Sequence, residues 1–245
     1  MAWSVLVTPR SFGDRGKAAL GILNDAGCNV MLNPYGRYLT EDELMCLSED
    51  VDGIIAGLDP ITSRVLRHGK RLKVISRYGV GIDTVDLSTA TELGIVVTNT
   101  PGANSTAVAE LSLALMLDVA RHVSEADREV RGGAWRRYTG VELTRKVLGI
   151  VGTGRIGKTL AKLVKGFEMT VLCFDIMPDY VWAHEAGAVY VSLDELLVQS
   201  DFISIHVPLV EGTHHLIGEK QLELIKSTSI VVNTSRGGIV DEKAL

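Results

Sequence analysis

The stretch Val147–Asp175, VLGIVGTGRIGKTLAKLVKGFEMTVLCFD, decides the fold. It opens with the apolar run Val147–Val151, which has the length and composition of a buried parallel strand. The Gly-rich turn Gly152–Gly157 follows at once, and apolar residues then recur at helical spacing. A second apolar run, Val171–Phe174, ends in Asp175. The order of strand, Gly-rich turn, helix, strand and acid is that of a dinucleotide-binding unit.

The three glycines of this turn have separate roles in such a unit. Gly152 permits a tight turn, Gly154 lets the backbone approach a pyrophosphate, and Gly157 lets the helix pack close to the sheet. The helix N-terminus offers N–H groups and a partial positive charge to the phosphates. Asp175 can accept hydrogen bonds from both ribose hydroxyls and repels a 2′-phosphate, so the pattern predicts NAD rather than NADP. The alternative is a structural turn that holds no phosphate. The expected cofactor contacts are Gly152, Thr153, Gly154, Arg155, Ile156, Gly157 and Asp175.

Composition limits the class of protein. Apolar residues make up 46% of the 245 residues and charged residues 22%, as in an ordinary globular protein of one or two domains. The net charge of −5 gives no support for a nucleic acid partner. The longest apolar stretch, Leu111–Leu117, is too short to span a bilayer, and the N-terminus lacks a signal-peptide pattern, so no membrane partner is expected. Cys28, Cys46 and Cys173 are odd in number and form no CxxC pair, which suggests reduced core thiols in a cytoplasmic protein.

Residues 1–100 alternate between short strands and helices. Such alternation predicts a parallel sheet covered on both faces, in a separate small α/β unit. Thr40 begins a capping box with Glu43, which is a helix start signal. The unit ends near Asn99–Pro101, so residues 101–245 form the second domain. The expected strands are Val5–Thr8, Asn29–Leu32, Gly53–Ala56, Leu72–Ser76 and Ile95–Asn99. The expected helices are Gly16–Ala26, Glu41–Ser48, Thr62–His68 and Leu87–Leu93.

A long helix is expected after this boundary. Asn104 or Ser105 can cap its start, and Gly132-Gly133 ends it. Its apolar stripe predicts a packing face, either against the nucleotide domain or against a second subunit. The stripe comprises Val108, Leu111, Leu115, Val119, Val123, Ala126 and Val130.

The alternation resumes after the Gly-rich unit. Asp241–Leu245 is typical of the first turn of a helix that the sequence cuts off. A doubly wound sheet normally has strands beyond this point, so a longer protein is expected. The expected strands are Val189–Val191, Asp201–Val207 and Ile230–Thr234, and the expected helices are Leu193–Val198 and Lys220–Lys226.

Several separated motifs follow one another in a recognisable order: SRYGVGID at Ser76–Asp83, NTPGANS at Asn99–Ser105, AEL at Ala109–Leu111, the GTGRIG turn, HVPL at His206–Leu209 with Thr213, and VNTSRGGIVDE at Val232–Glu242. With these motifs the sequence resembles the D-isomer-specific 2-hydroxyacid dehydrogenases, and within them the D-3-phosphoglycerate dehydrogenase-like branch. The resemblance covers nearly the whole chain. Thr84 departs from the Asn that the family often has after the GVGxD loop, which weakens the assignment to a subfamily.

The resemblance implies an α/β protein with two doubly wound parallel-sheet domains. These are a flavodoxin-like substrate domain, split in sequence, and a Rossmann NAD-binding domain inserted within it, with the active site in the cleft between them. Backbone N–H groups around Gly79, Val80 and Gly81 are implied to hold the substrate carboxylate, and glycines let the backbone come close to an anion. Arg77 could pair with a second anion such as a phosphate, with Arg10 assisting, or be a solvated loop charge. The implied substrate-binding residues are Arg77, Tyr78, Gly79, Val80, Gly81 and Asn104.

Arg236 is the residue expected to carry the chemistry. It follows a strand of the nucleotide domain, where open α/β sheets place their sites. A guanidinium there can pair with a carboxylate and polarise a 2-keto oxygen while hydride leaves the nicotinamide. The alternative is a surface arginine in a solvated loop. His206 is interpreted as part of the cofactor wall and not as the catalytic acid. The resemblance adds His206, Val207, Pro208, Thr213, Thr234, Ser235 and Arg236 to the cofactor contacts.

The family's acid–base pair is a histidine tuned by a glutamate, and both lie by resemblance past Leu245. No metal site is predicted, because His214 and His215 are adjacent, point in different directions and have no third ligand at a suitable spacing. Three other histidines on expected helices are interpreted as surface or packing residues: His68, His122 and His184.

The function that the resemblance implies is NAD-dependent hydride transfer to or from a small D-2-hydroxy or 2-keto acid. The first candidate substrate pair is 3-phosphoglycerate and 3-phosphohydroxypyruvate, the first step of serine synthesis. The alternatives are a glyoxylate or hydroxypyruvate reductase, and a non-catalytic NAD-binding interaction protein, because fold alone does not separate these. The chain is expected to be part of a larger enzyme; ending at Leu245 it would be catalytically crippled. The long helix and the resemblance both predict a homodimer.

Overall fold

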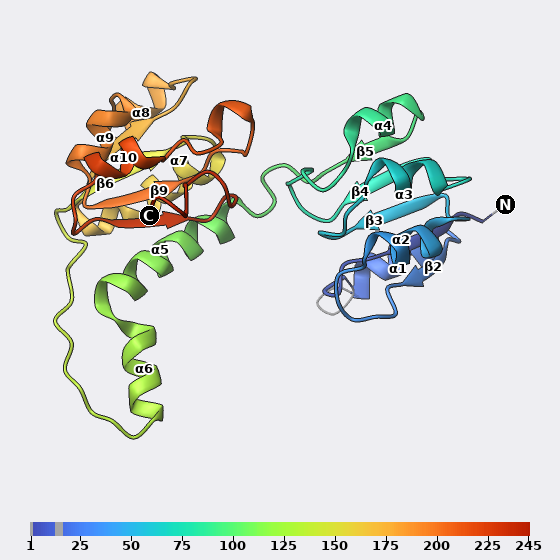
Figure 1. The fold of residues 1–245 in the computed structure, drawn as a ribbon, viewed down its shortest axis with the longest axis horizontal. Coiled ribbons are helices and arrows are strands. Elements are labelled where there is room, and N and C mark those ends of the chain that lie inside the picture. Colours follow the sequence, from blue (N-terminus) through green and yellow to red (C-terminus); the bar gives the residue numbers. More distant parts are fainter. Residues whose placement is uncertain (1, 13–16) are drawn as a thin grey trace. The chain divides into compact units, whose positions relative to one another are not determined.

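The computed structural model describes residues 2–12 and 17–245. The chain forms two units, Met1–Asn104 and Ser105–Leu245, and each is built around its own five-stranded parallel sheet (Figure 1). The predicted α/β class with two doubly wound parallel sheets is confirmed. The units divide at Asn104, slightly later in the chain than the boundary expected at Asn99–Pro101.

The first unit has the strand order β2-β1-β3-β4-β5, the flavodoxin-like order. Its strands run parallel, and the order reverses between β1 and β3, so loops from these two strands diverge at their carboxyl ends. The strands are β1 (Ser4–Val7), β2 (Asn29–Leu32), β3 (Gly53–Ala56), β4 (Val74–Arg77) and β5 (Val96–Thr98).

Three helices of the first unit begin at capping side chains, those of Thr40, Thr62 and Asp86. The predicted capping box is confirmed, since Thr40 Oγ1 accepts from Glu43 N at 3.3 Å and Glu43 Oε2 accepts from Thr40 N at 2.9 Å. Gly16, the first residue of one expected helix, lies outside the described residues. The helices are α1 (Lys17–Asp25), α2 (Glu41–Ser48), α3 (Ser63–His68) and α4 (Leu87–Glu92).

The second unit has the order β10-β9-β6-β7-β8, again all parallel. The chain starts at β6, adds β7 and β8 on one side, and then crosses to β9 and β10 on the other. The topological switch point therefore lies between β6 and β9. The strands are β6 (Val147–Val151), β7 (Thr170–Phe174), β8 (Ala188–Tyr190), β9 (Phe202–Ile205) and β10 (Ile230–Asn233).

Helices cover both faces of this second sheet. On β6, Leu148 and Ile150 pack in one core cluster with residues of α5 and α7, while Val151 packs in another with α9. This alternation is the period of two that a strand requires. Cys173 on β7 is fully buried in the first cluster, and burial raises the pKa of its thiol to about 12. The helices are α5 (Ser105–Arg121), α6 (Val123–Arg131), α7 (Arg155–Leu163), α8 (Tyr180–Ala186), α9 (Leu193–Gln199) and α10 (Glu219–Leu224), with short 3₁₀ turns η1 (Val164–Phe167) and η2 (Glu211–Thr213).

The prediction of one long helix before the Gly-rich unit is wrong, because the structure contains two. His122 separates α5 from α6 in a left-handed conformation, with φ of 55°. The Asp118 carboxylate accepts hydrogen bonds from Ser124 N at 2.7 Å and from Ser124 Oγ. This side chain therefore satisfies an amide at the start of α6 and competes with continuous helical bonding. His122 lies at the break rather than on a helix face, with Nδ1 3.1 Å from Glu125 Oε2.

An extended connection, residues 132–146, returns from α6 to β6 (Figure 1). It is tied to the end of α5, where Val141 N donates to Ala120 O at 2.8 Å. Asp241–Leu245 form a single turn, in which Leu245 N donates to Asp241 O at 3.2 Å, rather than an assigned helix. In the part of the chain that the structure describes, no helix has the length and apolarity needed to cross a membrane.

Gly149 on β6 generates a stability prediction, because a Cβ there would lie 2.4 Å from both Leu196 Cδ2 and Ser200 Oγ. We expect Gly149→Ala to lower the free energy of unfolding by about 1–3 kcal/mol through overpacking. Gly166→Ala is the matched control, since a Cβ at Gly166 meets open space. Urea unfolding of both variants measures the difference, and a Gly149→Ala protein as stable as wild type would contradict this packing.

Candidate functional site

The Gly-rich turn lies at the switch point of the second sheet and brings three elements into close contact. Gly152 has φ of +96°, and a Cβ on it would lie 2.8 Å from His206 O at the end of β9. A Cβ on Gly157 would lie 2.2 Å from Gly152 O, so α7 packs directly on the turn that precedes it. Only glycine fits these two positions, for the conformational and steric reasons that the sequence predicts.

The start of α7 is shaped for an anion. A Cβ on Gly154 would meet nothing within 4 Å, so space is open beside its backbone. Gly154 is also the N-cap of α7 and supplies no side-chain hydrogen bond to the first turn. The amides of a helix start without such a cap, together with the helix dipole, favour a phosphate group. These residues therefore fit the pyrophosphate of a dinucleotide.

Asp175 follows β7 and is held against the same turn. Its Oδ2 accepts hydrogen bonds from Thr153 N at 2.7 Å and Thr153 Oγ1 at 3.1 Å, while Oδ1 accepts from Met177 N at 2.9 Å. Register explains the contact, because Val151 pairs with Phe174 and the residues that follow both strands are therefore level. A carboxylate held beside a phosphate-binding turn is placed to accept hydrogen bonds from ribose.

His206 lies at the end of β9, next to the Gly-rich turn. Its Nε2 is 2.9 Å from Ser204 Oγ, and burial lowers the pKa of its imidazole to about 4. The ring is therefore neutral at pH 7. Val207 also contacts the turn, since its Cγ1 would lie 2.9 Å from a Cβ on Gly152. Thr213 Oγ1 donates to Pro208 O at 2.5 Å and so closes the loop after β9.

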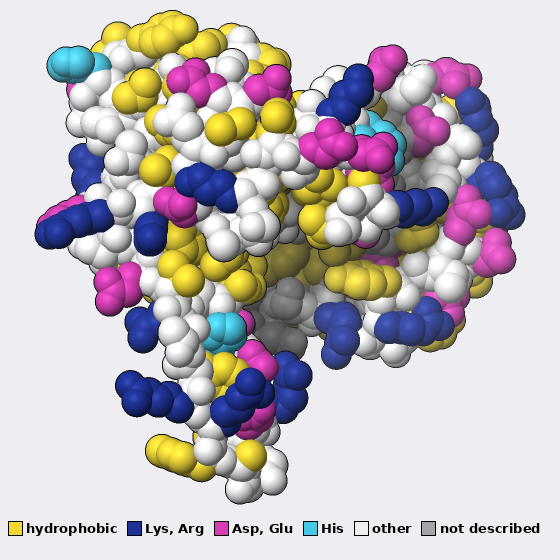
Figure 2. Space-filling model, turned by 60° about the vertical axis from the view of Figure 1, so that its left-hand side comes forward, with side chains coloured by type: hydrophobic (Ala, Val, Ile, Leu, Met, Phe, Trp, Pro, Cys, Tyr) yellow, Lys and Arg dark blue, Asp and Glu magenta, His cyan; other side chains and the backbone are white. Residues whose placement is uncertain are grey.

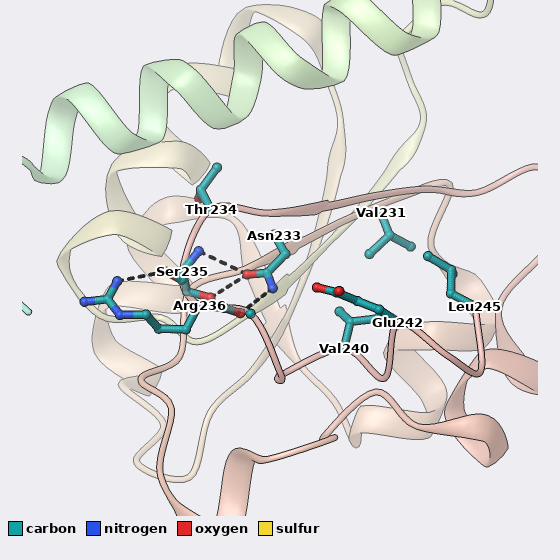
Figure 3. Close-up of a pocket in the computed structure, with 9 residues that line it drawn as sticks. Val231, Asn233, Thr234, Ser235, Arg236, Val240, Glu242 and Leu245 are labelled. Atoms are coloured by element: carbon teal, nitrogen blue, oxygen red, sulfur yellow. Dashed lines mark hydrogen bonds between the residues drawn. The ribbon is translucent and has the colours of Figure 1, made fainter. Parts of the chain in front are cut away.

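A pocket of about 450 Å³ opens at the carboxyl end of β10 (Figure 3). Asn233 organises the loop there, because its Oδ1 accepts from Ser235 N at 3.0 Å and its Nδ2 donates to Arg236 O at 2.7 Å. The Arg236 guanidinium donates to Ser235 O at 2.8 Å and extends away from Glu242 in Figure 3. Thr234 Oγ1 lies 2.9 Å from Ser112 Oγ of α5, which ties this loop to the helix layer.

The structure therefore gathers the predicted cofactor residues and Arg236 at one edge of one sheet. They follow four neighbouring strands, in the spatial order β10, β9, β6 and β7. This edge is the carboxyl edge, where open parallel sheets bind their ligands. Of the predicted substrate residues, Arg77 instead ends β4 of the first unit, residues 78–81 follow that strand, and Asn104 ends the unit.

The position of Arg77 excludes one of the two interpretations that the sequence left open. It is only 4% exposed, and its Nη1 donates to Ala56 O at 2.8 Å and to Tyr78 O at 3.3 Å. The interpretation as a solvated loop charge is therefore wrong. The guanidinium braces the ends of β3 and β4. Gly79 has φ of +141°, and its N–H donates to Arg77 O at 2.9 Å. Of the three amides predicted to hold the substrate carboxylate, those of Val80 and Gly81 therefore remain as candidates.

Several residues of these sites were missed by sequence reasoning. Asn99 Nδ2 donates to Val80 O at 2.8 Å, and Thr100 N and Oγ1 both donate to Gly79 O at 3.1 Å, so this segment supports the glycine loop. Glu242 lines the pocket beside Arg236. Asn99, Thr100 and Glu242 all lie within the quoted motifs, which is the signal that could have identified them.

A Gly-rich turn, an open helix start and an acid on the neighbouring strand define a dinucleotide-binding α/β domain. A sequence profile described as D-isomer specific 2-hydroxyacid dehydrogenase, NAD binding domain, matches residues 113–245. The chain belongs to this family and contains its NAD-binding domain.

Relatives with assigned activities differ in their substrates. A glyoxylate reductase from Korarchaeum cryptofilum is 45% identical over 204 residues, which cover 80% of this chain and 61% of that protein. A D-3-phosphoglycerate dehydrogenase from Methanocaldococcus jannaschii is 41% identical over 211 residues, covering 84% of this chain and 40% of that protein. The chain thus spans 61% and 40% of the lengths of these relatives.

A solved structure has a similar fold. The crystal structure of D-lactate dehydrogenase from Aquifex aeolicus, in complex with NAD and lactic acid, is 32% identical, with a TM-score of 0.82. The match covers 98% of this chain and 71% of that chain. Both the family profile and this neighbour agree with the NAD prediction.

The lowered pKa of His206 generates a pH prediction. The unfolded chain binds a proton at His206 below its ordinary pKa of 6.5, whereas the folded protein binds one only near pH 4. The free energy of unfolding should therefore fall as the pH drops from about 6.5 to 4, by up to about 3 kcal/mol from this group. Urea unfolding across this range should show a smaller fall for His206→Asn than for wild type. His184→Asn, which removes an exposed imidazole, should keep the wild-type slope, and equal slopes for all three proteins would contradict the assignment.

Proposed function

We propose that this chain is the cofactor-binding and substrate-holding part of an NAD-dependent dehydrogenase that acts on small D-2-hydroxy acids. The observation that carries this proposal is the single edge of the second sheet, where the Gly-rich turn, Asp175 and Arg236 follow neighbouring strands. A phosphate-binding turn alone would suit many proteins. An arginine in a pocket on the same edge adds a group that recognises a carboxylate or a keto oxygen.

Each part of the edge has a proposed task. The amides at the start of α7 hold the pyrophosphate, and Asp175 holds the ribose. When bound, NAD supplies the hydride acceptor. Arg236 binds the substrate carboxylate and stabilises negative charge on the 2-oxygen, for which a fixed guanidinium needs little reorganisation. In the first unit, the Gly-rich loop offers the amides of Val80 and Gly81 to an anion. The proton-transferring histidine and its glutamate are expected C-terminal to Leu245, as the resemblance implies.

Two substrate classes have support. The first candidate is 3-phosphoglycerate with 3-phosphohydroxypyruvate, the first step of serine synthesis, supported by the likeness to the Methanocaldococcus enzyme. The second is glyoxylate or hydroxypyruvate, supported by the likeness to the Korarchaeum enzyme. The three cysteines form no disulfide, which supports a reducing, cytoplasmic location.

The test is an NADH-oxidation assay on phosphohydroxypyruvate, hydroxypyruvate and glyoxylate, paired with the intact mass of the protein from its natural source. Turnover by a protein well above 26.5 kDa supports the proposal, and the ratio of kcat/KM values assigns the substrate. NAD binding without turnover of any of the three acids would favour the non-catalytic interaction protein instead.

Arg236→Ala in the active protein should lower kcat/KM by about 100- to 1000-fold, because the transition state loses its main charge partner. NADH affinity, measured by nucleotide fluorescence, should change by less than about threefold. Arg145→Ala is the matched control, since Arg145 is an exposed arginine of the same unit, paired with Glu168. Unchanged turnover in Arg236→Ala would remove the role assigned to Arg236.

We further propose that the second unit mediates a homodimer. Leu111, Leu115 and Val119 form an exposed apolar stripe along α5, although other α5 residues are buried in the core. The stripe continues on the arm formed by α6 and residues 132–146, where Val130 is 53% exposed and Trp135 is 93% exposed. Figure 2 shows apolar and charged side chains mixed along this projecting arm. Apolar patches of this kind mark protein interfaces, and a second copy of the chain is the proposed partner.

Val119→Asp should convert the dimer to a monomer, raising the dimer dissociation constant by at least about tenfold, because a carboxylate would be buried in the interface. Sedimentation equilibrium measures this change. Ile22→Asp, which places the same charge at a 70% exposed position of α1, should leave the dimer intact. A wild-type protein that is monomeric at micromolar concentration would contradict the proposal.

A further inference from the structure

Four polar groups form a continuous chain that ends on Asp175. Asp179 N lies 3.1 Å from the Tyr190 hydroxyl, which lies 2.6 Å from Thr153 Oγ1, which lies 3.1 Å from Asp175 Oδ2. Thr153 is 4% exposed, so these bonds are shielded from water. Tyr190 is the last residue of β8 and pairs with Cys173 of β7, which places its ring beside the end of the strand that carries Asp175.

The protons in this chain can be ordered from chemistry. The Asp179 N–H can only donate, so Tyr190 accepts from it. An ionised Asp175 carboxylate can only accept, so Thr153 donates its single hydroxyl proton to Oδ2. The remaining proton, on Tyr190, therefore points to Thr153 Oγ1. All bonds run in one direction toward the carboxylate, and each polarises the next.

The far end of the chain is anchored independently. Asp179 accepts from Trp182 N at 3.0 Å and so caps α8, and its other oxygen pairs with Lys158 of α7. Tyr190 is also wedged edge-on against Tyr180, with ring centroids 5.4 Å apart. The Tyr190 hydroxyl is therefore a fixed point, against which Thr153 and then Asp175 are positioned.

We propose that Tyr190, acting through Thr153, is a positioning residue that sets the orientation of the Asp175 carboxylate and thereby the discrimination of NAD from NADP. This inference rests on the proposed role of Asp175 as the ribose-binding acid. With Oδ2 accepting from both Thr153 N and Thr153 Oγ1, the carboxylate cannot turn away from an incoming 2′-phosphate. When the Tyr190 hydroxyl is absent, Thr153 Oγ1 keeps Asp175 as a partner but loses the bond that fixes its own position, so one of the hydrogen bonds that orient the carboxylate weakens.

The experiment measures dissociation constants of the full chain for NADH and NADPH by nucleotide fluorescence. Tyr190→Phe keeps the ring and removes only the hydroxyl. The ratio of the NADPH to the NADH dissociation constant should fall by about threefold to tenfold, the effect of one hydrogen bond. Tyr180→Phe is the matched control, because it removes a phenol from the same aromatic cluster outside the chain of bonds. Its ratio should equal that of wild type.

Asp175→Ala separates this inference from the proposed function on which it rests. An unchanged ratio in Asp175→Ala would overturn the role of Asp175 itself. If Asp175→Ala lowers the ratio and Tyr190→Phe does not, only the positioning role of Tyr190 is overturned. In an Asp175→Ala background, Tyr190→Phe should have no further effect on the ratio, and an undiminished effect there would show that Tyr190 acts by another route.

Variants of Thr153 keep the test decisive if Tyr190→Phe fails to fold. Thr153→Val removes the hydroxyl at nearly constant volume and should reproduce the fall in the ratio, whereas Thr153→Ser should restore most of it. If Tyr190 had only a structural role, its loss would lower the stability in urea and weaken NADH and NADPH binding by the same factor, which leaves the ratio unchanged. Equal ratios for the Val and Ser variants would overturn the proposal.

Discussion

The structure of the second unit depends on how closely α7 approaches the turn that precedes it. A methyl group at Gly157 would lie 2.2 Å from Gly152 O, and one at Gly152 would lie 2.8 Å from His206 O. These contacts place the start of a helix within the fork between β6 and β9. The dipole of that helix and the amides at its start then face the one edge where loops from four strands converge. Asp175 reaches Thr153 because β6 and β7 are paired in register.

The two units share one sheet topology but carry different groups at the carboxyl edge of the sheet. In each, the order of a five-stranded parallel sheet reverses beside the first strand. In the second unit, this edge carries Asp175 and the start of α7, which has no side-chain cap. In the first unit, the buried Arg77 donates from Nη1 to the carbonyl oxygens of Ala56 and Tyr78, while Asn99 and Thr100 donate to carbonyl oxygens of the glycine loop. The carboxyl edge of the second unit therefore has the features of a phosphate site, whereas side chains of the first unit fix the conformation of its glycine loop.

Local pattern predicted most of the fold, because strands and helices leave periods of two and 3.6 in the sequence. Apart from the long helix, which is divided at His122, the expected strands and helices are present in the described residues, with ends that differ by a residue or two. Features that depend on contacts between side chains distant in sequence were not predictable. The break at His122 depends on Asp118 capping Ser124, and the burial of Arg77 depends on the end of β3. The Gly-rich turn and Asp175 could be predicted as cofactor residues because their spacing is itself the signal, and the remaining predicted contacts came from the family resemblance. Tyr190 had no such signal, since it meets Thr153 only after β8 joins the sheet.

The buried thiol on β7 has a consequence for how opening of the second unit can be observed. Cys173 lies in the core beneath α5 and α7, with a pKa near 12, so it holds almost no thiolate at neutral pH. Thiol reagents attack the thiolate and need access to it, which leaves the folded state inert. Cys46, in contrast, is exposed on the first unit. The rate at which a thiol reagent labels Cys173 therefore measures how often the nucleotide-binding domain opens. Ligands that bind at the Gly-rich turn will lower that rate.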